Sequence, residues 1–209
     1  YKLAGIHLNR AVAAQRQGRH AEAEARYRQA QELFDEVPGS VHVRTQRATV
    51  RMNRGDNLET MGLLDGADQC HEQAQALFDD LSSRYGAQSG SANVRINRAN
   101  TLQSRGRHLE AEALYAEIDA LLWGLPASLE KLEARTVASL NHGINLQALG
   151  HYDAAGEQLR AALQFLLAQD RSTAVRSMQG TILSNLANNA SLRGQCGESE
   201  QAFAAAIDL

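Results

Sequence analysis

The chain has 209 residues, 44 % of them hydrophobic, and a formal charge of −3, so we expect a folded chain with a buried core. The 21 basic and 24 acidic residues give no overall charge that would favour nucleic acid or an anionic membrane. Two prolines and 5 % aromatic residues favour long helices over a β-sandwich. No apolar run approaches the roughly 18 residues of a transmembrane helix. The two cysteines form no disulfide or metal motif, which predicts a cytoplasmic protein.

An internal repeat dominates the sequence. Five glycines follow one another at intervals of 44 residues: Gly18, Gly62, Gly106, Gly150 and Gly194. An asparagine stands nine residues before each of them: Asn9, Asn53, Asn97, Asn141 and Asn185. A small residue stands seven residues before each: Ala11, Gly55, Ala99, Gly143 and Ala187. Large side chains predominate nine residues after each: Tyr27, His71, Tyr115, Leu159 and Phe203. Repetition at this length predicts a repeat architecture.

The conserved offsets follow helical spacing on both sides of each glycine. We therefore expect a helix that ends near the glycine, a tight turn, and a second helix that begins two or three residues later. One such hairpin has an apolar face that it can bury only against the next hairpin. The sequence predicts one repeat domain over residues 1–209, with units at about 1–38, 45–82, 89–124, 132–168 and 176–209. The predicted linkers are residues 38–40, 85–91, 124–126 and 169–172. Because Leu209 falls on a core offset, we expect a fragment of a longer protein.

The repeat resembles the tetratricopeptide repeat (TPR) family. The segments that carry the resemblance are Gly18–Ala23 with Tyr27 and Ala30, Gly106–Ala111 with Tyr115, and Gly150–Ala155. The long period is similar to that of kinesin light chains and bacterial signalling proteins. The resemblance implies an all-α fold, a right-handed α-solenoid of five TPR-like hairpins whose first helices line a concave groove. One position departs from the family, which often has leucine directly after the asparagine; here it carries Arg10, Arg54, Arg98 and His142.

The groove face implied by this resemblance carries the candidate peptide-binding residues. All eleven asparagines lie in first helices, although asparagine is a mediocre helix former. An asparagine amide both donates and accepts, so it can pair with the backbone of an extended peptide. With hairpins about 10 Å apart and a peptide rise of about 3.3 Å, one asparagine would meet every third ligand residue. The predicted site comprises Asn9, Thr49, Asn53, Asp56, Asn93, Asn97, Asn100, Val137, Asn141, Ile144, Asn185 and Asn188. In the alternative interpretation these asparagines only fix the repeat geometry.

Three other patterns have two interpretations each. Asn57, Asn145 and Asn189 lie one residue off the groove face, which favours a structural role. A periodic basic row comprises Arg51, Arg54, Arg95 and Arg98. It either binds an acidic or phosphate-bearing ligand or, as we favour, pairs with acids of adjacent helices such as Glu22, Glu24 and Glu110. An apolar stretch in the fourth unit, namely Val137, Leu140, Ile144 and Ala148, either anchors a partner or packs internally.

No catalytic arrangement is predicted. His142 and Cys196 suggest a cysteine protease, but both occupy ordinary repeat positions. We expect no cofactor and no metal, because neither an HExxH motif nor a glycine-rich phosphate loop is present. The predicted function is a non-catalytic scaffold, of bacterial origin by its composition, that binds a protein, an extended peptide segment or a domain of the same longer chain, but neither nucleic acid nor membrane. The alternatives are a regulatory or sensor segment of a larger effector (a CHAT-type protease, signalling ATPase or transcription regulator) and a structural spacer or self-assembly module.

Overall fold

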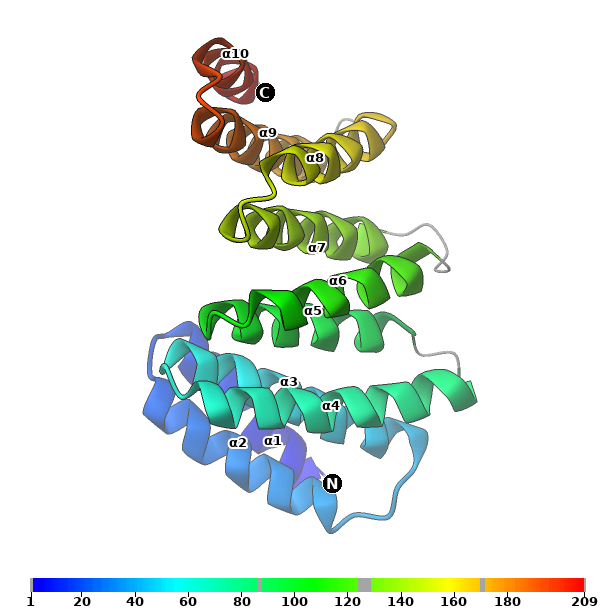
Figure 1. Ribbon diagram of the computed structural model, residues 1–209. Helices are drawn as coiled ribbons and strands as arrows, with labels where there is room; N and C mark the ends of the chain where they lie inside the picture. Colours follow the sequence, from blue (N-terminus) through cyan, green and yellow to red (C-terminus); the bar gives the residue numbers. More distant parts are fainter. Residues whose placement is uncertain (1, 86–87, 124–128, 170–171, 209) are drawn as a thin grey trace. The chain divides into compact units, whose positions relative to one another are not determined.

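The computed structural model describes residues 2–85, 88–123, 129–169 and 172–208, and all regular structure in these segments is α-helical (Figure 1). The predicted all-α fold is therefore confirmed. The helices are α1 (Lys2–Arg16), α2 (His20–Asp35), α3 (Val41–Thr60), α4 (Leu64–Tyr85), α5 (Gln88–Ser104), α6 (His108–Trp123), α7 (Leu129–Ala148), α8 (Tyr152–Leu167), α9 (Thr173–Leu192) and α10 (Cys196–Ile207).

The chain forms two compact units, Tyr1–Arg107 and His108–Leu209. Unit one contains α1 to α5, and unit two contains α6 to α10. Within each unit every helix packs on the next one along the chain. The first helices of consecutive hairpins also touch, α1 with α3 and α3 with α5 in unit one, and α7 with α9 in unit two. The first helices thus lie side by side within each unit.

All five periodic glycines adopt the same left-handed turn. Their φ angles are between 73° and 78°, a region that costs side-chain-bearing residues energy and glycine almost none. At the first turn, Gly18 N–H donates to the Gln15 carbonyl and Arg19 N–H to the Ala14 carbonyl. The same pair of bonds recurs at the other four glycines. This arrangement satisfies the last carbonyls of the first helix and starts the second helix after two residues, as the sequence predicts.

The linkers follow the sequence prediction in part. Ser40 and Ser172 cap α3 and α9, each side chain accepting a hydrogen bond from the backbone N–H three residues later. The linker predicted over residues 85–91 is wrong in length, because α5 already begins at Gln88. Gly90 is the reason: it lies inside the helix, where a Cβ would come within 2.4 Å of the Phe78 ring. It permits close packing and does not break the helix. The linker prediction at 124–126 falls outside the described residues.

Close approach between helices explains the small residue seven positions before each glycine. All five such residues are buried, and in four of the five repeats so is the large side chain nine positions after the glycine. The exception is Phe203 in α10, which is 41 % exposed. The contact is tightest at Gly55, where a Cβ would lie 2.4 Å from Nε2 of the fully buried His71. A larger residue at position 55 and the imidazole cannot occupy this space together.

We therefore expect Gly55→Ala to lower the free energy of unfolding by about 1–3 kcal/mol, since it overpacks a filled site. Gly5→Ala is the matched control, because a Cβ there meets no atom within 4 Å. In the helix α1 it is expected to raise stability by about 0.5–1 kcal/mol. Urea denaturation of both variants measures the difference, and equal effects would contradict this account of the small residue.

Two buried asparagines connect neighbouring hairpins through the same pair of hydrogen bonds. The amide nitrogen of Asn57 donates to the carbonyl of His20, the first residue of α2, over 3.1 Å. Its amide oxygen lies 3.0 Å from Nδ1 of the same histidine. Asn145 and His108, the first residue of α6, repeat both contacts at 3.0 Å. Both asparagines are fully buried. The structural role predicted for these residues is confirmed.

Asn189 makes a variant of these contacts. Its amide nitrogen donates to the carbonyl of Tyr152, the first residue of α8, over 2.9 Å, and its oxygen accepts from Gln147 over 3.2 Å. Thr101 occupies the equivalent position in α5, and its hydroxyl lies 3.1 Å from Nδ1 of His71. Each of these contacts joins a first helix to the hairpin before it.

These contacts predict that Asn57→Ala will cost about 1–3 kcal/mol of folding free energy, because the change leaves the partly buried carbonyl and imidazole of His20 without their partner. Asn53→Ala, one turn earlier on the accessible side of the same helix, should change stability by no more than about 0.5 kcal/mol. Chemical denaturation monitored by circular dichroism compares them. A similar cost for both variants would show that the buried bonds are not what stabilises this interface.

Candidate functional site

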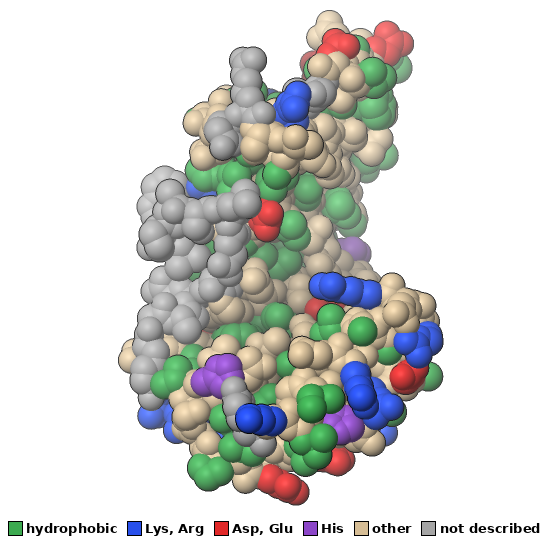
Figure 2. Space-filling view, turned by 180° about the vertical axis from the view of Figure 1, so that it is seen from behind, with side chains coloured by type: hydrophobic (Ala, Val, Ile, Leu, Met, Phe, Trp, Pro, Cys, Tyr) green, Lys and Arg blue, Asp and Glu red, His purple; other side chains and the backbone are tan. Residues whose placement is uncertain are grey.

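The face predicted to bind a peptide is accessible in both units. All twelve predicted residues are partly or fully exposed, and they lie on the first helices α3, α5, α7 and α9 and on α1. Hydrophobic and uncharged surface takes up most of the side of the molecule shown in Figure 2, where charged side chains are scattered. A surface of this composition suits a ligand that is recognised through its backbone and a few apolar side chains.

In unit one, the asparagines of this face fall into two groups. The amide of Asn97 donates to Oδ1 of Asp56 over 2.7 Å, and Asn100 also has an interaction within the chain. Within the part of the chain that the structure describes, the side chains of Asn9, Asn53 and Asn93 make no hydrogen bond. Their donors and acceptors face solvent. The structure thus brings three unused amides and one acidic side chain onto one face of α1, α3 and α5.

Asp56 is itself held by neighbouring residues. Its Oδ1 lies 3.0 Å from Nε2 of His71 and accepts from Asn97, while the side chain remains 36 % exposed. The carboxylate also contributes to the raised pKa of Tyr27, which burial in the first place and the charge of Asp56 in the second raise to about 12. Asp56 therefore presents a fixed negative group at the centre of this face.

A cavity of about 500 Å³ opens at the end of this face in unit one. It lies between α1, the end of α2 and the start of α3, and its lining is Lys2, Gly5, Ile6, Leu8, Asn9, Phe34, His42 and Gln46. Asn9 is the only predicted site residue among them. The cavity combines an unused amide with an apolar wall, as a small binding site requires.

Unit two has a cavity of about 400 Å³ at the equivalent place. It lies between α7 and α9, and its lining is Glu133, Thr136, Val137, Leu140, Ser177, Met178 and Thr181. Val137 and Ile144 are 45 % and 47 % exposed, so they do not pack internally, whereas Leu140 is half-buried against the core. The apolar stretch predicted in the fourth unit thus lies partly in a cavity and partly on open surface.

The remaining predicted asparagines of unit two differ from one another. Asn185 donates to the carbonyl of Thr181 one turn earlier, over 2.9 Å, and Asn141 has an interaction within the chain. Asn188 is exposed and makes no side-chain hydrogen bond with the described residues. Unit one therefore presents three unused amides on its first helices, whereas unit two presents one, that of Asn188.

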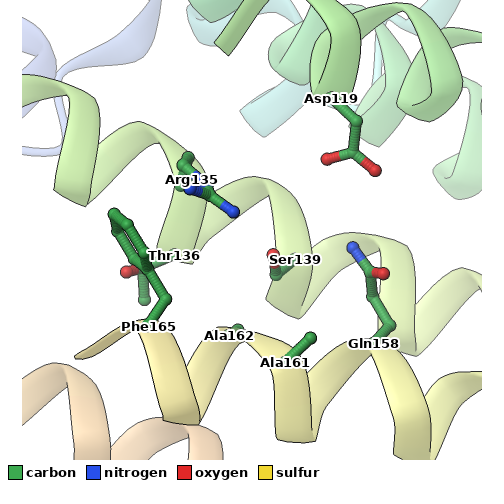
Figure 3. A pocket seen from close by; sticks show the side chains of 8 residues that line it. All are labelled: Asp119, Arg135, Thr136, Ser139, Gln158, Ala161, Ala162 and Phe165. Atoms are coloured by element: carbon green, nitrogen blue, oxygen red, sulfur yellow. The ribbon is translucent and has the colours of Figure 1, made fainter. Parts of the chain in front are cut away.

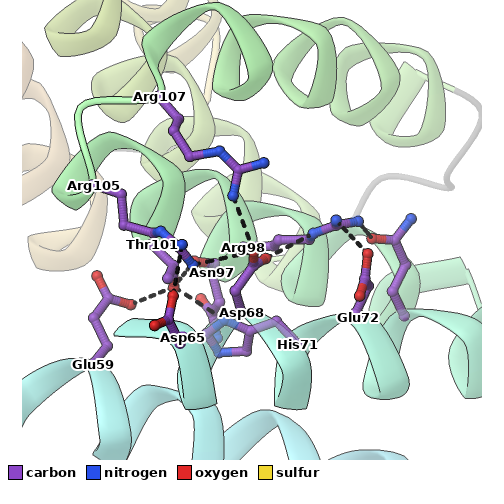
Figure 4. A network of polar contacts seen from close by, with 11 residues as sticks. Glu59, Asp65, Asp68, His71, Glu72, Asn97, Arg98, Thr101, Arg105 and Arg107 are labelled. Atoms are coloured by element: carbon purple, nitrogen blue, oxygen red, sulfur yellow. Dashed lines mark hydrogen bonds and ion pairs between the residues drawn. The ribbon is translucent and has the colours of Figure 1, made fainter. Parts of the chain in front are cut away.

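The basic row is paired internally. Arg54 contacts the buried Glu24 at 2.9 Å, and Arg98 contacts Asp68 at 3.2 Å. Arg105 and Arg107 also reach Asp68, at 3.5 Å and 3.3 Å, and Figure 4 shows the resulting network. The preference for pairing with adjacent helices is confirmed, and Glu24 is one of the acids that the sequence suggests.

The other two arginines of the row use acids that the sequence analysis did not name. Arg51 contacts Asp35 at 2.7 Å, and Arg95 contacts Asp79 at 2.8 Å. Burial raises the pKa of Asp79, but the hydrogen bonds from Arg95 and Ser91 outweigh that effect and hold the pKa below its ordinary value. These arginines are therefore structural. They do not form a phosphate-binding row.

The direction of the Asp79 shift predicts a pH dependence. Because the pKa in the folded state lies below that of the unfolded chain, the carboxylate stabilises the fold above the ordinary aspartate pKa, and this stabilisation is lost as the pH falls through the folded-state value. We expect the wild type to lose more stability than Asp79→Asn between neutral pH and pH of about 3. Urea denaturation at both pH values measures it, and equal losses would refute the assignment.

Two classes of site find no support in the described segments. Among residues 2–85, 88–123, 129–169 and 172–208, no three His, Cys, Asp or Glu side chains gather to hold a metal ion. No helix in the same segments combines the length and apolar character needed to cross a bilayer. His142, one of the two residues that suggest a protease, contacts Glu112 at 2.7 Å and stacks on Tyr115.

Comparison with known proteins agrees with the repeat geometry. Residues 2–80 match the family described as tetratricopeptide repeat. The fold of the described helices is that of tetratricopeptide repeats. None of the curated proteins compared with the sequence matches it.

Several solved structures share the TPR fold. One is BtubC (BKLC) from P. vanneervenii, with a TM-score of 0.76 and 18 % identity over 95 % of this chain and 76 % of that one. A second is a putative kinesin light chain from Podosopora anserina with nearly identical TPR-like repeats, with a TM-score of 0.74 and 18 % identity over 97 % and 92 %. The apo form of RapI aligns at a TM-score of 0.77 and 14 % identity, over 97 % and 68 %. At these identities the likeness shows the fold alone.

Sequence reasoning missed most residues that line the two cavities. Gln46 and Met178 each stand sixteen residues before a periodic glycine, one in each cavity. Gly5 and Val137 also share an offset, thirteen residues before the glycine. The signal was therefore present as a repeated position, although the residue types at it differ.

Proposed function

We propose that this TPR chain is a non-catalytic scaffold that binds an extended peptide segment of a partner protein along the accessible face of α1, α3 and α5. One observation carries the proposal: the amides of Asn9, Asn53 and Asn93 make no hydrogen bond with any described residue. Asparagine is a weak helix former, so these three residues lower the stability of their helices. Their amides make no hydrogen bond with the described residues that would offset this cost.

The buried asparagines provide the contrast that supports this proposal. Asn57 stands four residues after Asn53 in α3, is fully buried, and uses both its donor and its acceptor. The same residue type thus has a structural role at position 57 and an open hydrogen-bonding group one turn earlier, at position 53. An extended backbone offers one N–H and one carbonyl per residue, which is what an asparagine amide can pair with.

The two cavities add side-chain selection to this backbone recognition. The cavity at Asn9 has the apolar walls of Ile6 and Phe34 beside the unused amide. The cavity at Val137 in unit two is lined by apolar and hydroxyl side chains together with Glu133, and its apolar part suits a single aliphatic side chain of a ligand. We assign the first cavity to the same peptide that contacts Asn9, and the second to an apolar anchor on the partner.

The test compares two sets of substitutions against peptides selected from a random extended-peptide library. The triple variant Asn9→Ala, Asn53→Ala, Asn93→Ala should weaken binding ten-fold or more, since each lost hydrogen bond costs about 0.5–1.5 kcal/mol. Its stability should not fall, because alanine is the better helix former. Fluorescence anisotropy measures the affinity, and chemical denaturation measures the stability.

A matched control replaces exposed glutamines of second helices, Gln29→Ala and Gln69→Ala, and should leave the affinity unchanged. A ligand N-methylated at alternate backbone positions should bind more weakly to the wild type but equally to the triple variant. If the triple variant binds as the wild type does, or loses stability, the asparagines are architectural and the proposal is wrong.

A further inference from the structure

A second polar cavity lies on another side of α7, away from the face just described. It has a volume of about 220 Å³ and lies between α6, α7 and α8 of unit two (Figure 3). Its lining is Asp119, Arg135, Thr136, Ser139, Gln158, Ala161, Ala162 and Phe165. Ser139 is two residues from Val137, which places the two side chains about 200° apart around the helix. The two cavities share Thr136 but no other lining residue.

The repeats show what fills this place elsewhere in the chain. Ser139 stands two periods of 44 residues after Arg51, and one period after Arg95. The Arg51 side chain is 13 % exposed and contacts Asp35 at 2.7 Å and Gln73 at 3.3 Å. The position of Gln73 becomes Ala161, which lines the cavity, and that of Asp35 becomes Trp123 in the sequence. The cavity opens where the chain replaces a long cation by serine and its acceptor by alanine.

A second guanidinium is missing at the same place. In unit one, Arg54 donates to Gln31 at 3.1 Å, and Arg98 donates to Gln75 at 3.2 Å. The residue equivalent to these glutamines is Asp119, and the residue equivalent to the arginines is His142. Because the imidazole is shorter and bonds Glu112 at 2.7 Å, Asp119 receives no cation from it. Asp119 thus carries a negative charge where the earlier repeats have a neutral glutamine, and the arginine that would donate to it is absent.

Three polar side chains of the cavity are unused, whereas the hydroxyl of Thr136 donates to the carbonyl of Leu132. Ser139 is 9 % exposed, and its hydroxyl has no hydrogen bond within the part of the chain that the structure describes. The same holds for the carboxylate of Asp119 and the amide of Gln158. Figure 3 shows Ser139 between α7 and α8, with Asp119 and Gln158 on one side of it. The Ser139 hydroxyl is thus open to a hydrogen bond from a ligand in the cavity.

The charge of the cavity decides between cationic and anionic ligands. Arg135 lines the opposite side, where its guanidinium stacks 4.0 Å from the centre of the Phe165 ring, and it has further interactions within the chain. The unpaired charge is the carboxylate of Asp119. An anion would meet that carboxylate, whereas a planar cation finds the carboxylate, an amide oxygen and a hydroxyl as acceptors.

We propose that this cavity binds the guanidinium group of an arginine side chain supplied by a partner protein. The partner's arginine takes the place that Arg51 and Arg95 occupy in the earlier repeats, with Asp119 as its counter-charge and Gln158 and Ser139 as further acceptors. A guanidinium suits this site better than an ammonium group, because its donors lie in one plane and can reach several acceptors at once. The inference does not depend on the peptide face of unit one.

The test uses small probes on the whole chain. N-acetyl-arginine amide is titrated into isotope-labelled protein, and chemical shifts of α7 and α8 are followed by nuclear magnetic resonance. N-acetyl-citrulline amide has the same shape without the charge, and N-acetyl-lysine amide has the charge without the plane. We expect the arginine probe to bind at least ten-fold more tightly than citrulline and more tightly than lysine, with an affinity that falls as salt is added.

Two variants locate the site. Asp119→Asn should weaken the arginine probe ten-fold or more, while Glu157→Gln removes the same charge from an exposed position of α8 outside the cavity and should have no effect. Ser139→Arg restores the residue of the earlier repeats, fills the cavity with the chain's own guanidinium and should abolish binding. If Ser139→Arg does not fold, the Asp119→Asn comparison decides alone.

The proposal is overturned if no shifts appear at saturating concentrations of the arginine probe, or if citrulline binds as tightly as arginine. It is also overturned if Asp119→Asn and Glu157→Gln have the same effect, since the charge would then act only through the net charge of the protein. Loss of binding at Asp119 with normal peptide binding at unit one separates this site from the proposed groove.

Discussion

The architecture depends on the fact that a single helical hairpin cannot bury its own apolar face. Each hairpin must therefore approach its neighbour closely, which explains why a small residue recurs seven positions before every periodic glycine and a large one recurs nine positions after it. At Gly55 and His71 the fit leaves no room for a methyl group. The buried asparagines and the ion pairs of Arg54 and Arg98 then fix the geometry of contacts that apolar packing alone would leave free to slide.

This arrangement divides one residue type between two tasks. Along α3, Asn57 is buried against the preceding hairpin, whereas Asn53, one turn earlier, stays partly exposed. The buried positions fix how hairpins are joined, so their residues must change together with their partners. The accessible positions have no such constraint, and their residues can vary with the ligand while the fold stays intact. A scaffold built in this way separates what keeps it folded from what it recognises.

The sequence predicts the periodic part of the structure well and the exceptions poorly. The glycine turns, the hairpins and the buried role of Asn57 follow from residues that recur at fixed offsets. Gly90 was read as a breaker because the sequence does not show the Phe78 ring against which it packs. Asp35 and Asp79 were missed as partners of the arginines because they stand seventeen residues after their periodic glycines, outside the offsets compared. Asp119 and Ser139 were missed for the opposite reason: their information lies in a departure from the repeat, and a search for recurrence passes over it.

The recurrence of the hairpin interfaces has a consequence for the evolution of such chains. The interface of α2 with α3 and that of α6 with α7 contain the same hydrogen bonds, since Asn57 and Asn145 each bond the histidine 37 residues earlier. The side-chain hydrogen bond to an acidic residue 30 positions back, from Arg54 to Glu24 and from His142 to Glu112, recurs with it. A duplication or deletion of two whole repeats would thus join surfaces that already fit one another. Array length can change in a single genetic step, without the intermediate forms that a new interface would require.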